Sequence, residues 1–149
     1  MGCVCSKAEC LAALPHAAAC LAPFTGVAHL LRNGWPISSE TPGPFAPKYA
    51  ALLDAIHAAI SGTDAATIAL AGVRSTDPDH QRAADLLAEV AGSAPDSRER
   101  ARQLRTLLAR KNTVEYESRK ASVKDARDGV ERASRIVDWA KEVLAKARL

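Results

Sequence analysis

A repeat of small and apolar residues near the end of the chain restricts the possible folds most strongly. Eight such residues follow each other at alternating steps of three and four positions: Val123, Ala126, Val130, Ala133, Val137, Ala140, Leu144 and Ala147. This spacing places side chains on one face of an α-helix, so it predicts a long helix with a continuous apolar seam. Ser122 and Asp125 have the spacing of an N-terminal capping arrangement, so we expect the helix to begin there.

Similar patterns predict three further helices upstream. A second helix should run from about residue 46 to 73, with Tyr49, Leu53, Ile56 and Ile60 as its buried stripe. A third should begin with Asp77 as N-cap and Pro78 in the first position, and end near residue 91. A fourth should open at Asp96 or Ser97. Its inward residues are Ala101, Leu104, Leu107 and Leu108.

The N-terminal part predicts one more helix and a connector. Residues 7–32 are mostly apolar and are expected to form a buried first helix, with a break possible at Pro23. Residues 33–47 hold four prolines and two glycines, which is typical of a connector. Residues 1–45 are therefore assigned to the same domain as the core, 46–149. The prediction is a single all-α domain, a four- to five-helix up-and-down bundle.

Four cysteines and a possible lipidation signal lie near the N-terminus. Cys3, Cys5, Cys10 and Cys20 do not have a zinc-site spacing, so reduced thiols are expected. Residues 1–6, MGCVCS, match an N-myristoylation pattern, which leaves a lipid-anchored adaptor as an alternative. Residues 10–31 approach the length of a membrane span, but prolines, a glycine and histidines interrupt them. We expect no membrane association and a cytoplasmic location. The Ala- and Arg-rich composition is typical of bacterial proteins.

Positive charge is concentrated late in the chain. Residues 98–124 hold nine Lys/Arg and three Asp/Glu, although the net charge of the whole chain is only +3. Such a block suggests a face that binds phosphate. A solvated helix face is the alternative interpretation.

Residues 107–145 carry a resemblance to a known family. A helix ending in Arg-Lys-Asn-x-x-Glu-Tyr (110–116) is followed by a short basic link and a long final helix. This arrangement resembles the C-terminal half of a HEPN domain, and the likeness extends over about residues 46–147. The resemblance implies a helical bundle, usually dimeric. Many HEPN domains are metal-independent RNases with an Arg-x4–6-His motif, whereas others bind nucleic acid, nucleotides or a nucleotidyltransferase.

The resemblance implies roles for particular residues. Arg110 stands at the motif arginine, Lys111 or Asn112 at its polar follower, and Glu115 and Tyr116 where the histidine is expected. Arginine suits stabilisation of a phosphorane. Tyr116 can donate a proton, and Glu115 can act as a base if burial raises its pKa. The candidate catalytic residues are Arg110, Glu115 and Tyr116. The candidate nucleic-acid-binding residues are Arg105, Lys111, Asn112, Arg119 and Lys120.

Two functions remain open at this point. The first is an RNA-binding protein or metal-independent RNase of toxin–antitoxin or phage-defence type, acting as a homodimer without metal or cofactor. His57 or His80 could then supply the missing imidazole. The second is a non-catalytic interaction module, an antitoxin or the partner of a nucleotidyltransferase. In that case Asp54 or Asp64 could pair with Arg110 and give the arginine a purely structural role.

Overall fold

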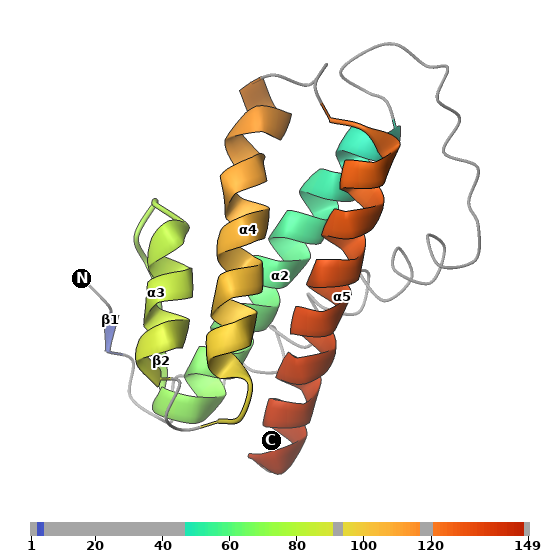
Figure 1. Ribbon diagram of the computed structural model, residues 1–149. Coiled ribbons are helices and arrows are strands. Elements are labelled where there is room, and N and C mark those ends of the chain that lie inside the picture. The colour runs from blue at the N-terminus through green and yellow to red at the C-terminus, as the bar shows by residue number, and fades with distance from the viewer. Residues whose placement is uncertain (1–2, 5–46, 91–93, 117–120, 148–149) are drawn as a thin grey trace.

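A computed structural model describes residues 3–4, 47–90, 94–116 and 121–147, and this part of the chain is mostly helical (Figure 1). The helices are α2 (Pro47–Ala71), α3 (Gln81–Glu89), α4 (Ser97–Tyr116) and α5 (Val123–Lys146). The predicted all-α class is therefore confirmed for these residues. The helix predicted at 7–32 lies outside them.

The long helices pack side by side, with α4 antiparallel to both α2 and α5 (Figure 1). Leu52 meets Gly129, and further along both helices Gly62 meets Val137, so α2 and α5 run parallel. An up-and-down order would make α2 and α3 antiparallel. Instead both run opposite to α4, because residues 72–80 return along the bundle before α3 begins (Figure 1).

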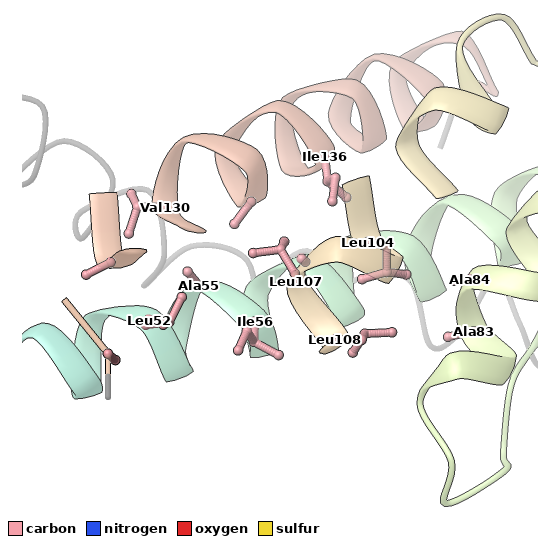
Figure 2. Close-up of a cluster of buried hydrophobic side chains, with 14 of the residues drawn as sticks. Leu52, Ala55, Ile56, Ala83, Ala84, Leu104, Leu107, Leu108, Val130 and Ile136 are labelled. Atoms are coloured by element: carbon pink, nitrogen blue, oxygen red, sulfur yellow. The ribbon is translucent and has the colours of Figure 1, made fainter. Parts of the chain in front are cut away.

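The core divides into two main clusters. The larger one joins α2, α3, α4 and α5 around Leu52, Ile56, Leu104, Leu107 and Ile136, which are at most 1% exposed (Figure 2). The second surrounds Trp139, whose indole Nε1 donates a hydrogen bond to the Pro95 carbonyl over 3.0 Å. Trp139 is 6% exposed, so it fills the interior rather than covering an edge of the bundle.

The predicted buried positions were mostly right. All four inward residues of α4 are buried, as are Ala126, Val130, Ala133, Val137 and Ala140 of the α5 seam. The stripe on α2 was placed slightly off centre, because Leu52 is buried whereas Leu53 and Ile60 are only partly buried. The alanines of α2 account for this difference. Their small side chains pack against α5, so the buried face of α2 is centred on them and not on Leu53.

The helix ends confirm one prediction and correct another. At α5, the Ser122 hydroxyl accepts from the Asp125 amide, and Asp125 accepts from the Ser122 amide, which completes a capping box. At the end of α2, Gly72 has a φ of +69° and its N–H donates to the Ile68 carbonyl. The start predicted for α3 was wrong. Asp77 caps a turn by accepting from the Asp79 amide, and α3 begins only at Gln81.

One feature was not predicted. Strand β1 (Cys3–Val4) pairs antiparallel with β2 (Val73–Arg74), which directly follows α2. Cys3 lies opposite Arg74, and Val4 lies opposite Val73. Two residues are too few for any alternation of polar and apolar side chains, so the sequence carried no strand signal here.

Candidate nucleic-acid interface

Arg110 lies where the C-terminal half of α4 meets the first turn of α5. Helix α4 is held in place by Leu104, Leu107 and Leu108, whose side chains are buried in the core. From this position Arg110 donates from Nη1 to the carboxylate Oδ1 of Asp125. The Arg110 side chain remains 39% exposed, and that of Asp125 is 30% exposed. The partner is thus Asp125, and the predicted pairing with Asp54 or Asp64 was wrong.

The two carboxylate oxygens of Asp125 accept hydrogen bonds from different residues at this junction. Its Oδ2 accepts from the Ser122 amide over 2.9 Å and from the Ser122 hydroxyl over 2.7 Å, while Oδ1 accepts from Arg110. These bonds, led by the Ser122 amide, lower the pKa of Asp125 to about 2. The carboxylate is therefore charged throughout the neutral range, and the residue that caps α5 also orients Arg110.

Arg105 forms a similar pair on another side of α4. Its Nη2 donates to Oδ1 of Asp85 on α3 over 2.9 Å, and both side chains are more than 40% exposed. The Arg82 guanidinium lies 3.7 Å from the same carboxylate. Five positions on an α-helix correspond to about 140° of rotation, so Arg105 and Arg110 point towards different neighbours. The structure therefore does not bring these two candidates into one cluster.

The other candidates lie at the same end of α4 or just beyond it. Lys111 is partly buried. Asn112, Glu115 and Tyr116 belong to the last turns of α4, within about 9 Å of Arg110 along the axis. Their side chains, together with Arg119 and Lys120, fall outside the described residues.

The basic block is spread along α4 rather than gathered in one patch. Arg100 donates to Gln103 over 2.9 Å, and Arg102 lies 3.4 Å from Glu99. One regularity of these arginines was not predicted. Arg98, Arg102 and Arg105 follow each other at steps of four and three, so they lie along one line of α4, on the side from which Arg105 reaches Asp85 of α3. Those steps were the signal that could have revealed it.

The alternative acid–base candidates are located elsewhere on the bundle. His57 is exposed on α2, so it is not a packed core residue, and His80 lies just before α3. Asp64 is partly buried in the third quarter of α2. Burial raises its pKa to about 6, while the charge of Arg74 opposes the shift. Asp64 is not a partner of Arg110, whose carboxylate partner is Asp125.

Among residues 47–90, 94–116 and 121–147, no group of three or more His, Cys, Asp and Glu side chains is arranged to hold a metal ion. No helix of the described part has the length and apolar character needed to cross a membrane. No protein-family model, curated protein or solved structure matches this chain.

Proposed function

We propose that this chain is a HEPN-like RNA-binding domain that acts as a homodimer and contacts phosphate through Arg110. The observation that carries the proposal is the state of this arginine, which is oriented by a carboxylate and still exposed to solvent. The bond to Asp125 uses one of its two terminal nitrogens. A guanidinium has five N–H donors in a rigid fork, so Arg110 keeps donors for a phosphate oxygen.

The surroundings of Arg110 favour an anionic ligand. Lys111 follows it on α4, Lys124 lies in the first turn of α5, and Arg119 and Lys120 lie between the two helices in the sequence. Residues 110–125 hold five Lys/Arg and three Asp/Glu, so a net charge of +2 remains in this stretch. Several such contacts would track an RNA backbone, and binding should then weaken steeply as salt increases.

Metal-independent cleavage would be the chemical extension of this binding. Such a reaction needs a base for the 2′-hydroxyl, an acid for the leaving oxygen and positive charge at the phosphorane. Arg110 would supply the charge. Glu115 and Tyr116, one to two turns further along α4, are the proposed acid–base groups. The resemblance of residues 110–116 to the family motif supports these assignments, although the motif histidine is replaced.

Incubation of the purified full-length protein with total RNA and with tRNA, in the presence of a chelator, tests this function. Cleavage by the wild type that is lost in Arg110→Ala would support an RNase. Arg135→Ala is a matched control, because Arg135 is also an exposed arginine in an ion pair, with Glu131 on α5. If the protein neither cleaves nor binds RNA, the proposal fails.

A non-catalytic interaction module is the second candidate, and one observation favours it. Two candidate arginines form ion pairs with carboxylates of neighbouring helices. Arg105 pairs with Asp85 on α3, and Arg110 pairs with Asp125 on α5. Such pairs can serve simply to join α4 to α3 and α5. Stable co-purification with a partner protein, together with unchanged RNA binding in Arg110→Ala, would favour this alternative.

A further inference from the structure

Helices α4 and α5 lie side by side (Figure 1), and a hydrogen bond across their boundary marks each end of it. Arg110 donates to Asp125 at one end. At the other end, the Trp139 indole donates to the carbonyl of Pro95, shortly before α4 begins. Fourteen positions separate Asp125 from Trp139, which brings them to within about 40° of each other around the axis of α5. The side of α5 that carries these two residues therefore faces α4.

Asp128 and Arg132 occupy the middle of this side of α5. They follow Asp125 at steps of three and four, and both are partly exposed. Within the described part of the chain, neither side chain forms a hydrogen bond or an ion pair. Arg135, three positions further on, instead pairs with Glu131. Arg132 is therefore a guanidinium at the α4–α5 boundary that no described carboxylate neutralises.

The facing side of α4 adds a second guanidinium of this kind. Arg100 donates from Nη1 to Oε1 of Gln103 over 2.9 Å, and its buried Nε has no hydrogen-bond partner among the described residues. Counting seven positions from the first hydrogen bond along each of the antiparallel helices reaches Gln103 on α4 and Arg132 on α5, which therefore lie at the same level. Two guanidinium groups without a carboxylate partner are thus present near the middle of the boundary.

We propose that Arg132 is a second phosphate contact, and that an RNA strand bound at Arg110 continues along the α4–α5 boundary towards it. This inference rests on the proposed function. The seven positions from Asp125 to Arg132 correspond to about 10 Å along the axis, a distance that a strand of a few nucleotides covers. A guanidinium with its donors free can hold a phosphate through two parallel hydrogen bonds. Asp128 lies between the two contacts, so its negative charge weakens the attraction without removing it.

Titration of a labelled single-stranded RNA with the full-length protein at several salt concentrations tests this path. Arg132→Ala should weaken binding and reduce the slope of log K against log salt by about 0.7, which corresponds to one phosphate contact on a single strand. Combined with Arg110→Ala, it should reduce the slope by about twice as much. Asp128→Asn should tighten binding, because it removes a negative charge from the path. Arg135→Ala is the matched control and should change neither quantity, because Arg135 is engaged by Glu131.

The outcomes separate this inference from the proposed function. If Arg110→Ala weakens binding but Arg132→Ala binds as the wild type does, the path along α5 is overturned and the contact at Arg110 stands. Weaker binding by Asp128→Asn would also overturn the path. A wild-type protein that does not bind RNA would overturn both proposals. Thermal unfolding of each variant checks that the bundle is intact, and if Arg132→Ala is unstable, the sign of the change in Asp128→Asn decides.

Discussion

Arg110 on α4 donates a hydrogen bond to Asp125, the residue that also completes the capping box of α5. The orientation of the central candidate residue therefore depends on a helix start fifteen positions later in the chain. This connection also allows structural and functional effects to be separated. Asp125 and Ser122 stabilise the helix, whereas Arg110 is needed for the cap to a much smaller degree.

Substitution of the cap should cost more stability than substitution of the arginine. Ser122→Ala and Asp125→Ala should each lower the free energy of unfolding by about 1 kcal/mol, because the first turn of α5 loses its cap. Arg110→Ala should cost less than about 1 kcal/mol, because the ion pair is exposed to solvent. Urea unfolding at pH 7 measures all three. A larger loss in Arg110→Ala than in Ser122→Ala would contradict this order.

The contribution of Asp125 should disappear in acid. Its folded pKa of about 2 lies below the ordinary value of 3.8, so its stabilisation is present above pH 4 and is lost as the pH falls towards 2. The stability difference between wild type and Asp125→Asn should therefore shrink over this range. A difference that stays constant from pH 5 to pH 2 would contradict the assignment.

Asp64 should make stability depend on pH in the opposite direction from Asp125. Its folded pKa of about 6 lies above the ordinary value of 3.8, so the native state binds more protons than the unfolded state between these pH values. The free energy of unfolding should then fall by about 2 kcal/mol as the pH rises from 4 to 7. In Asp64→Asn this loss should be absent, so the variant should gain stability relative to the wild type at pH 7 but not at pH 4. Equal differences at both pH values would exclude this role for Asp64.

The two interhelical glycines should respond oppositely to alanine. A Cβ at Gly129 would overlap Cδ1 of Leu52, which is only 1% exposed, so Gly129→Ala should destabilise the protein by about 1–3 kcal/mol. A Cβ at Gly62 would lie 3.5 Å from Cγ2 of Val137, an ordinary contact. Gly62→Ala should stabilise it by about 0.5–1 kcal/mol, because alanine is the better helix former. Thermal unfolding of both variants checks the signs, and destabilisation by Gly62→Ala would contradict the packing of α2 on α5.

Trp139 should be sensitive in two separable ways. Trp139→Phe removes the N–H donor to the Pro95 carbonyl and should cost about 1 kcal/mol. Trp139→Ala also empties the second core cluster and should cost about 3–5 kcal/mol. Denaturant unfolding followed by circular dichroism measures both. Similar losses in the two variants would show that the ring contributes little to packing.

Local sequence patterns predicted most of the helical core. The cap at Ser122 and the buried face of α4 each depend on residues less than two turns apart, which sequence spacing reports directly. The start of α3 failed because Asp77 and Asp79 cap successive turns before the helix begins. An N-cap acid and a turn-forming acid look the same in sequence.

The candidate site was harder to predict because it depends on contacts between helices. Arg110 was identified as the central residue, but its partner lies on a different helix, and no spacing rule selects Asp125 over Asp54 or Asp64. Likewise, a block of basic residues in the sequence does not form one patch, because a helix distributes consecutive side chains around its axis. Arg105 therefore faces α3 while Arg110 faces α5.

Binding of labelled single-stranded RNA at low and moderate salt tests the central claim most directly, with wild type, Arg110→Ala and Arg135→Ala compared. We predict salt-dependent binding by the wild type and by Arg135→Ala. In Arg110→Ala, affinity should fall for all RNA sequences alike, and the slope of log K against log salt should decrease by about one phosphate contact. Wild-type protein that fails to bind RNA even at low salt, or Arg110→Ala that binds as tightly as the wild type, would contradict the proposed role of Arg110.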